Sequence, residues 1–415
     1  MRAAALLALA AGFAVTLLVA PWHDESVTDL PLYSAYADLF LDGNLPFRDV
    51  AFEYPPLAAP VIAVSGLAGG AADYRVAFAA LAFVLAAAMV LLCGLLAERT
   101  GGDRSRAMLG AALAPLLCGA MIRTHFDLVP VVLTLCCLVL LCADRPRLGL
   151  AVLGVAVAVK LYPVVIAPVA LAWLVARGQR RAALDAALAL ALVVVLAYGA
   201  AAVVSVTGTV DSLTYHLDRA VQVESSPAVV LGALDGFGLG VATPNGGHRS
   251  NGLDHPAAGA VVAAFVLVMA IAIGLLALGA SSRSEAGGPG PRQLVLASLG
   301  ATVAFACFGK VLSPQYLIWV VPLGALALAW RMPALTTAVV AALALTFAEF
   351  PAHYRELVDR VAWVEAVVTV RDLALIAVVG LVVRELSVRS VAEPARGSAR
   401  WRLRDRPVRP RSAPR

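Results

Sequence analysis

The stretch Ser26–Pro56, SVTDLPLYSAYADLFLDGNLPFRDVAFEYPP, is a long polar interruption near the start of an otherwise very apolar chain. Its ionisable residues are five carboxylates and one cation, namely Asp29, Asp38, Asp42, Asp49, Glu53 and Arg48. An apolar segment, Ala3–Ala20, leads into it, and a second apolar run follows it. This pattern predicts a functional loop on the outer face of a membrane, with the rest of the chain as its scaffold.

Composition supports the membrane interpretation. Hydrophobic residues make up 61% of the 415 residues and charged residues 14%, and the mean hydropathy is +0.87. Soluble domains are usually about half apolar and a quarter charged. A soluble protein of this size would need far more polar surface. The composition therefore predicts an all-α integral membrane protein that crosses the bilayer many times.

Apolar runs of near-spanning length predict about 12 transmembrane helices. Their approximate ranges are 3–20, 76–97, 107–122, 128–143, 147–160, 162–176, 182–205, 257–280, 293–309, 316–330, 333–349 and 366–389. The run 58–70 is too short to cross a hydrocarbon core of roughly 30 Å, so we expect a juxtamembrane or re-entrant helix there.

The distribution of Arg then sets the orientation, because cytoplasmic loops carry an excess of Lys and Arg. We expect both termini and the basic loop at 98–106 in the cytoplasm, and the outer loops 21–57 and 206–256 outside. Residues 1–389 would form one transmembrane module of the cell membrane. Residues 390–415 would form an Arg-rich, disordered cytoplasmic tail near anionic lipid, which accounts for the net charge of +5 without nucleic-acid binding.

The residues that could take part in a chemical reaction lie at the predicted outer face. The chain has thirty Arg and only two Lys, and both Lys residues, Lys160 and Lys310, fall at outer helix ends. A carboxylate there can take the proton from an attacking hydroxyl. Cations can stabilise the charge on a departing phosphate. The pattern predicts transfer of a group from a lipid phosphate, with Asp29 as the general base.

A purely structural role is also open for each of these groups. Asp29 is equally well placed to cap the helix that follows it, and the two Lys residues suit snorkelling at the membrane interface. Three further sets of residues also permit a purely structural role. Arg123, His125 and Asp127 could form one short loop network that satisfies itself. His216, Arg219 and Glu224 could form a solvated turn, and Arg371 and Asp372 could be a neutral pair between helices.

Four motifs in chain order resemble glycosyltransferase family 87, the polyprenol-phosphate-mannose-dependent mannosyltransferases of the GT-C superfamily. They are Asp29-x-x-x-Tyr33 with Gly43-x-x-Pro46-Phe47 and Glu53-Tyr54-Pro55-Pro56, then Lys160-Leu161-Tyr162-Pro163, then Tyr215-His216-x-x-Arg219-x-x-Gln222-x-Glu224-Ser225, and finally Lys310-Val311-Leu312-Ser313-Pro314-Gln315-Tyr316-Leu317-Ile318-Trp319. The resemblance covers roughly residues 26–330. Phe47 departs from it, because many members have Tyr there.

The resemblance implies a GT-C-type helical bundle with outer juxtamembrane helices and an inverting hexosyltransferase. Asp29 would be the base in the first outer loop. We expect the donor phosphate at Lys160, Lys310, Arg123 and His125. We expect the rest of the substrates at Tyr33, Glu53, Tyr54, Tyr162, His216, Arg219, Gln315 and Tyr316.

The expected partners are a polyprenyl-phosphate sugar, with mannose as the first choice, a glycolipid or glycan acceptor, and the bilayer. No cofactor or metal is predicted, although a loop-built Mg²⁺ site stays open. The sugar, the acceptor and the linkage are not set by the sequence.

Two other functions compete with this one. A transporter or lipid flippase would also fit about twelve helices, but transporters tend to show internal repeats and polar sites near the bilayer midplane. A non-catalytic membrane subunit of a cell-envelope assembly is the second competitor, and Asp29 together with both Lys residues argues against it.

Overall fold

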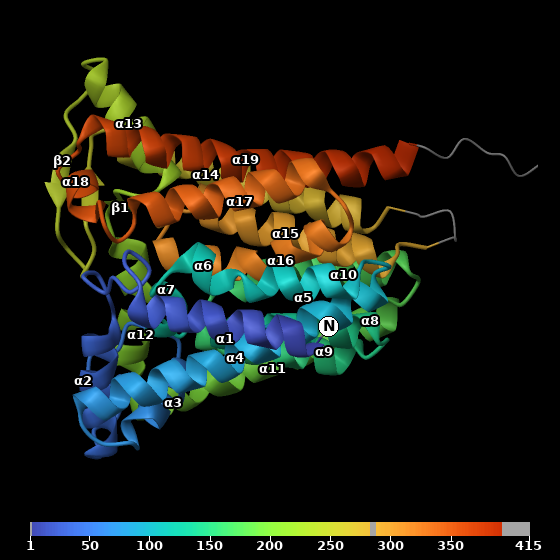
Figure 1. The fold of residues 1–415 in the computed structure, drawn as a ribbon, viewed down its shortest axis with the longest axis horizontal. Coiled ribbons are helices and arrows are strands. Elements are labelled where there is room, and N and C mark those ends of the chain that lie inside the picture. Colours follow the sequence, from blue (N-terminus) through green and yellow to red (C-terminus); the bar gives the residue numbers. More distant parts are fainter. Residues whose placement is uncertain (1, 283–287, 392–415) are drawn as a thin grey trace, which may run out of the picture.

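Helices that run side by side along the longest axis of the molecule dominate the computed structural model, which describes residues 2–282 and 288–391 (Figure 1). The bundle helices are α1 (Arg2–Leu18), α4 (Ala71–Arg99), α5 (Arg104–Ala112), α6 (Ala114–Cys118), α8 (Leu128–Cys142), α9 (Pro146–Val159), α10 (Ile166–Ala176), α11 (Arg180–Val204), α14 (Ala258–Ala280), α15 (Pro291–Phe308), α16 (Leu317–Ala329), α17 (Pro333–Glu349) and α19 (Ala362–Val391). The sequence-based expectation of a helical membrane-type bundle is confirmed.

Five helices in the described part of the chain are long and apolar enough to cross a membrane, namely α4, α11, α14, α15 and α19. Six shorter apolar stretches accompany them, at Arg2–Leu18, Leu128–Cys142, Pro146–Val159, Tyr162–Ala176, Pro314–Ala329 and Pro333–Glu349. The count of about 12 spans stays a prediction. Residues 392–415 of the expected tail lie outside the described residues.

The predicted continuous helix 107–122 is wrong, because the chain breaks twice within it. Helix α5 ends at Ala112, and α6 begins with Pro115 in its first turn, where the missing N–H does no harm. Gly119 follows with a φ of +55°, and a Cβ atom there would meet Phe347 Cε2 at 2.6 Å. Only glycine meets both demands, so the short α7 (Met121–Thr124) starts as a separate element.

The run 58–70 forms a helix of nine residues, α3 (Ala58–Gly66), which is too short to span a bilayer. It packs against α2 (Leu30–Leu41), which lies across the end of the bundle (Figure 1). The two backbones approach closely, because a Cβ atom on Gly66 would lie 2.8 Å from Ala37 Cβ. The prediction that this run does not span is therefore confirmed by its length.

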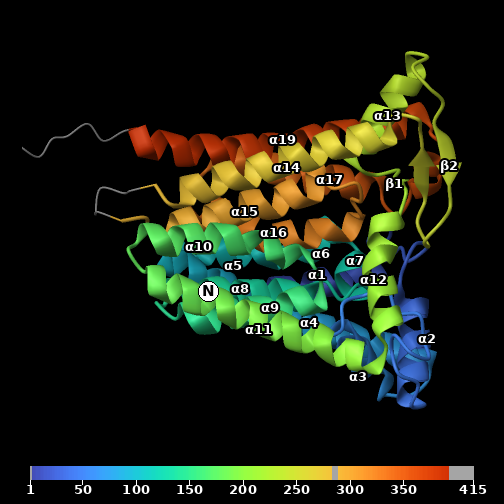
Figure 2. The same ribbon diagram turned by 180° about the vertical axis from the view of Figure 1, so that it is seen from behind.

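The end of the bundle marked by α2 also holds the remaining small elements (Figures 1 and 2). They are α12 (Val206–Asp218), α13 (Ser226–Gly236), α18 (Tyr354–Val358) and an antiparallel sheet of β1 (Val221–Gln222), β3 (Gly252–Asp254) and β2 (Thr243–Asn245), in that order. Leu253 of the central strand pairs with Val221 on one side and Pro244 on the other. The 3₁₀ turns η1 (Tyr162–Val165) and η2 (Pro314–Tyr316) lead into α10 and α16.

The opposite end of the bundle carries the connections α4–α5, α8–α9, α10–α11 and α16–α17 (Figures 1 and 2). These are the connections with the basic residues that the sequence assigned to one side of a membrane, such as Arg99, Arg145 and Arg331. Helices α11 and α14 expose most of their apolar side chains on the outside of the bundle. This arrangement suits a bundle that is surrounded by lipid and has two chemically different ends.

Candidate active site

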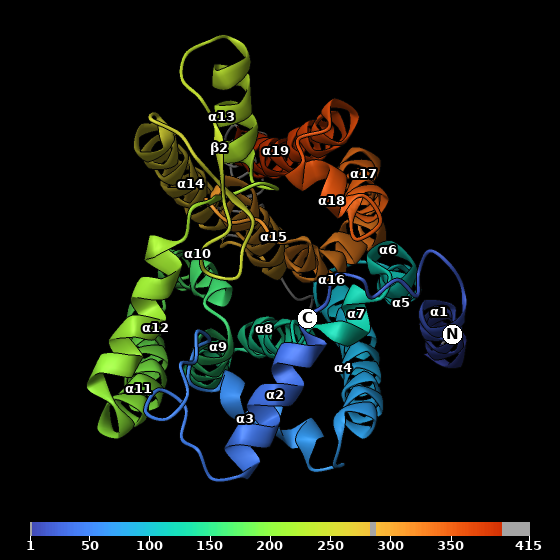
Figure 3. The ribbon, with the colours of Figure 1, turned by 90° about the vertical axis from the view of Figure 1, so that its left-hand side faces the viewer.

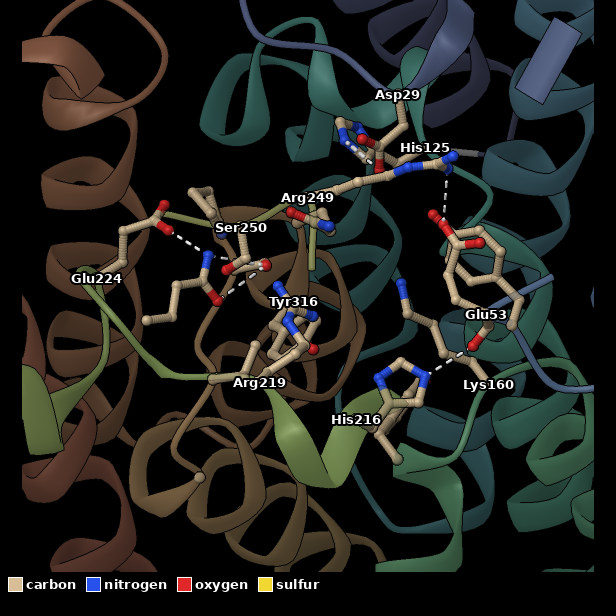
Figure 4. Close-up of a pocket in the computed structure, with 18 of the residues that line it drawn as sticks. Asp29, Glu53, His125, Lys160, His216, Arg219, Glu224, Arg249, Ser250 and Tyr316 are labelled. Carbon is tan, nitrogen blue, oxygen red and sulfur yellow. Dashed lines mark hydrogen bonds and ion pairs between the residues drawn. The ribbon is translucent and has the colours of Figure 1, made fainter. Parts of the chain in front are cut away.

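A pocket of about 360 Å³ lies at the α2 end, where the first loop, the α9–η1 junction, α12, the β2–β3 hairpin and the α15–η2 connection meet (Figure 4). Most residues that the sequence singled out line it: Asp29, Glu53, Tyr54, His125, Lys160, Tyr162, His216, Arg219, Lys310, Gln315 and Tyr316. The predicted residues that do not line it are Tyr33 and Arg123.

Asp29 stands at the start of α2, but its side chain makes no capping hydrogen bond to that helix. Instead, Tyr33 Oη donates to Asp29 Oδ2 at 3.1 Å, and His125 Nε2 lies 3.6 Å from the same oxygen. Burial raises the pKa of the Tyr33 phenol, which therefore stays a neutral donor. The Asp29 side chain is 36% exposed at the pocket. A carboxylate that is held on one oxygen and open on the other suits proton acceptance.

Glu53 is the second carboxylate near Asp29, and both of its oxygens have partners. Tyr36 Oη donates to Oε2, and Arg249 Nη1 lies 3.4 Å from Oε1. The side chain is only 11% exposed. The Glu53 backbone carbonyl lies 2.8 Å from His216 Nε2. These contacts make Glu53 a structural link between the first loop and α12.

Lys160 follows the last residue of α9 and reaches a fully buried carboxylate. Lys160 Nζ donates to Asp127 Oδ1 at 2.6 Å, and Trp319 Nε1 donates to the same oxygen at 2.5 Å. The ammonium also lies 4.9 Å from the ring centroid of Phe126 and 5.6 Å from those of Tyr316 and Trp319. A buried ion pair with surrounding rings holds the ammonium in one place, and Lys160 still lines the pocket.

The indole of Trp319 is sandwiched between two other rings. Tyr162 lies parallel to it at a centroid distance of 3.8 Å, and Tyr316 stacks on it at 4.0 Å. All three rings line the pocket, so they form a rigid aromatic wall beside Lys160.

Lys310 lies in the connection after α15 and donates to two backbone carbonyls, Leu217 O at 2.5 Å and Arg219 O at 2.7 Å. A cation at a helix C-terminus satisfies carbonyls that have no partner within the helix. Burial lowers the pKa of the Lys310 ammonium. Lys310 therefore fixes the end of α12, from which Arg219 extends.

Arg219, like Lys310, has no carboxylate partner among the described residues, but unlike Lys310 it also keeps an unsatisfied donor. Its Nε atom is buried and has no hydrogen-bond partner in that part of the chain. Buried donors of this kind usually have a partner. An Arg with an unsatisfied donor at a pocket is well placed to bind an anionic oxygen. Figure 4 shows it beside Tyr316, between Glu224 and His216.

Arg123 points away from the pocket, although His125 lines it. The short α7 ends at Thr124, and His125 is extended with φ −128° and ψ 144°, so the two side chains face different cavities. The Arg123 guanidinium is 4% exposed and bonds to Thr16 O and to Glu25. It joins the end of α1 to α7 and does not reach the other site residues.

This placement predicts that Arg123→Gln destabilises the fold. Thr16 O would lose both of its donors and the mostly buried Glu25 would keep only the exposed Arg75, and breaking a buried pair costs up to about 3–5 kcal/mol. We expect a clear fall in the thermal unfolding temperature in detergent, with unchanged activity per folded molecule. Arg75→Gln is the matched control, because Arg75 pairs with the same Glu25 but is 54% exposed. It should cost at most about 1 kcal/mol. An Arg123→Gln protein that unfolds normally but binds donor poorly would contradict this role.

The β2–β3 hairpin contributes to the pocket in a way that no sequence pattern predicts. His248, Arg249 and Ser250 from its tip line the pocket. Arg249 Nη1 donates to Tyr36 Oη at 3.0 Å and to Glu53 Oε1 at 3.4 Å. Tyr215 Oη donates to His248 O at 2.5 Å. The hairpin is thus tied to the first loop and to α12 over the pocket.

A buried polar cluster borders the pocket near Glu224. Gln222 Nε2 donates to Glu224 Oε2. The other carboxylate oxygen of Glu224, Oε1, has no hydrogen-bond partner among the described residues. Burial, followed by the nearby charge of Glu349, raises the pKa of Glu224 well above its ordinary value. Arg371, fully buried, bonds to Glu224 O and to Asp372 Oδ1. Arg371 and Asp372 form the predicted ion pair, but within α19 and not between two helices, and Arg371 also holds the Glu224 carbonyl at the pocket.

Within residues 2–282 and 288–391, no three or more His, Cys, Asp or Glu side chains are arranged to hold a metal ion. The pocket residues offer a carboxylate with one open oxygen, several cations and an aromatic wall.

One family profile matches the middle of the chain. The sequence profile of glycosyltransferase family 87 matches residues 52–247, which include Glu53, His125, Lys160 and Arg219. No curated protein matches the chain. The fold is similar to the crystal structure of ArnT from Cupriavidus metallidurans bound to undecaprenyl phosphate, with a TM-score of 0.49. The two sequences are 16% identical, and the alignment covers 94% of this chain and 76% of the ArnT chain. The apo form of the same protein is 17% identical, with a TM-score of 0.47 over 93% of this chain and 76% of that one.

Proposed function

We propose that the chain is a membrane glycosyltransferase that moves a sugar from a polyprenyl phosphate to an acceptor hydroxyl on the outer face of the cytoplasmic membrane. The match of residues 52–247 to the profile of glycosyltransferase family 87 supports this proposal. The observation that carries the proposal is the position of the Asp29 side chain and its contacts. Its carboxylate does not cap α2, and it faces a pocket that also holds Lys160 and Arg219. Base and cations in one pocket are what displacement of a lipid phosphate requires.

The proposed step has one bond forming and one breaking at the anomeric carbon. The acceptor oxygen attacks that carbon, the bond from carbon to the phosphate oxygen breaks, and its electron pair stays on the phosphate. The hydroxyl proton goes to Asp29, whose Oδ2 is held by Tyr33 while Oδ1 has no hydrogen-bond partner among the described residues. A single displacement inverts the configuration of the sugar.

The phosphate would lie on the side of Arg219 and Lys160. Arg219 brings a guanidinium without a carboxylate partner in the described chain, and Lys160 brings an ammonium already held in place by Asp127. Both can bind the oxygens on which negative charge grows. Lys310 acts one step away, because its bonds to Leu217 O and Arg219 O position the end of α12. His125 would help orient Asp29 from its distance of 3.6 Å.

The position of the pocket favours this reaction over transport. The pocket is lined by residues of the first loop, which leads into α2 at one end of the bundle, and by His248, Arg249 and Ser250 of the β2–β3 hairpin. Transport sites tend to lie near the midplane of the membrane. The phosphate of a lipid-borne donor lies at the membrane surface, where a pocket at this end of the bundle could bind it.

The direct test is sugar transfer by the purified protein in liposomes. Radiolabelled polyprenyl-phosphate mannose is compared with another hexose and a pentose donor, with lipid and glycan extracts as acceptors. Each assay is run with and without a chelator, because carboxylate oxygens suit Mg²⁺. Transfer of none of the sugars, in either condition, would overturn the proposal.

The proposed orientation makes a separate prediction. Because basic connections stay in the cytoplasm, the exposed Arg106 should be inside and the exposed Asp42 outside. In a Cys-free background, a membrane-impermeant maleimide added to intact cells should label Asp42→Cys and leave Arg106→Cys unlabelled until the membrane is opened. Labelling of the Arg106→Cys protein in intact cells would reverse the assignment.

A further inference from the structure

An apolar loop projects from the pocket end of the molecule. It follows α13 and comprises residues 237–241, which we name the apolar tip. Phe237 is 80% exposed, Leu239 65% and Val241 68%. Three large apolar side chains so exposed in five residues form a patch that needs a partner.

The apolar tip is carried by a firmly attached base. Leu231 of α13 is fully buried in a cluster with Val261 and Val262 of α14 and Val364 of α19. Arg360, just before α19, donates to Asp235 Oδ2 at 2.6 Å and to Glu365 Oε1 at 3.2 Å. The base therefore rests on the first turns of α14 and α19, both of which are candidate membrane spans.

The attachment sets the depth of the tip relative to the membrane. The tip projects sideways at the level where α14 begins (Figure 2), and it extends beyond the ring of bundle helices in the end view (Figure 3). Helix α14 exposes apolar side chains outward, such as Leu267 and Ile271. A bilayer that covers this surface of α14 would end near the first residues of the helix, beside the tip.

The chemistry of the tip suits lipid better than protein. Residues 236–242 read GFGLGVA and contain neither an ionisable nor a hydrogen-bonding side chain. Burying them in the boundary between headgroups and acyl chains removes no charge from water. A protein partner would instead meet a patch without the polar rim and the Tyr, Trp or Arg anchors that are typical of protein interfaces.

We propose that the apolar tip is a membrane-surface anchor that inserts into the interface of the outer leaflet beside α14. The chain continues from Val241 into β2 and then to the hairpin that carries Arg249 over the pocket. The anchor thus holds the near side of that hairpin against the membrane. The proposal does not depend on which sugar is transferred.

Fluorescence quenching in liposomes tests the proposal without an activity assay. The Phe237→Cys protein is labelled with bimane and reconstituted with lipids that carry a spin label either near the headgroup or at the chain end. The native cysteines are first replaced, so that bimane is attached only at position 237. We expect bimane at 237 to lose most of its emission to the shallow label and little to the deep one. The exposed Gly246, in the hairpin on the far side of β2, gives the matched Gly246→Cys control, which should keep its emission with both.

A second variant addresses the insertion itself. Adding Leu239→Asp to the labelled protein should restore the emission, because a carboxylate at the tip opposes entry into lipid. The base contacts of Asp235 do not involve Leu239, so the fold should persist. Full emission from bimane at 237 in both spin-labelled membranes, or quenching unchanged by Leu239→Asp, would overturn the anchor and assign the tip to water or to a protein partner.

Discussion

Asp29→Asn is expected to lower sugar transfer by about 10²–10⁴-fold, the usual contribution of a general base. Asn has nearly the same size and still accepts the Tyr33 hydrogen bond, so the pocket should keep its shape. It cannot take the proton of the acceptor hydroxyl at neutral pH. The measurement is the initial rate of transfer in liposomes at saturating donor, together with donor binding, which should survive.

Two further variants make that result specific. Asp38→Asn is the matched control, because Asp38 lies on α2 with its side chain exposed to solvent, and it should keep nearly full activity. Glu53→Gln tests the rival base. Glu53 has Tyr36 and Arg249 as partners, so this variant should lower activity less than Asp29→Asn does. The opposite order, with Glu53→Gln inactive and Asp29→Asn active, would transfer the role of base to Glu53.

Lys160→Met is expected to weaken the use of donor by about tenfold to a hundredfold, since a hydrogen bond to a charged group contributes roughly 1.5–3 kcal/mol. The effect should appear chiefly in the KM for donor. Lys160 also neutralises the fully buried Asp127, so its loss leaves an unpaired carboxylate inside the protein. A lower activity alone would therefore not separate phosphate binding from folding.

The double variant Lys160→Met/Asp127→Asn separates the two roles. It contains no unpaired buried charge, and the Asn oxygen can still accept from Trp319 Nε1. We expect its unfolding temperature to recover while the KM for donor stays raised. Recovery of both would show that Lys160 only balances Asp127. Lys310→Met is a useful comparison, because the Lys310 ammonium binds backbone carbonyls at the end of α12. This variant should change donor use only by displacing Arg219.

Sequence patterns locate most of the pocket because the charge rule assigns polar helix ends to one face. Lys160, Lys310 and Arg219 are found in this way, and all three line the pocket. The rule says which end of the bundle a residue occupies, but not where its side chain points. Arg123 shows this limit, since only the extended backbone at His125 turns the neighbouring side chains to different cavities.

The missed contacts join segments that are far apart in the chain. Arg249 meets Glu53 across 196 positions, and Trp319 meets Asp127 across 192. No local period or spacing connects such pairs, because they form only when helices from distant parts of the bundle pack together. The break in helix 107–122 is a different case. Pro115 and Gly119 are visible signals for it, but the apolar run outweighs them when only hydropathy is read.

The buried contact of Asp127 with Lys160 and Trp319 also has a consequence for biosynthesis. Trp319 leaves the ribosome 192 residues after Asp127, which at about 5–20 residues per second is a delay of roughly 10–40 s. Through that interval the aromatic wall is missing and the Asp127–Lys160 pair has no cover from α16. The contacts around Asp127 can therefore be completed only after α16 has been made, so this end of the bundle assembles late.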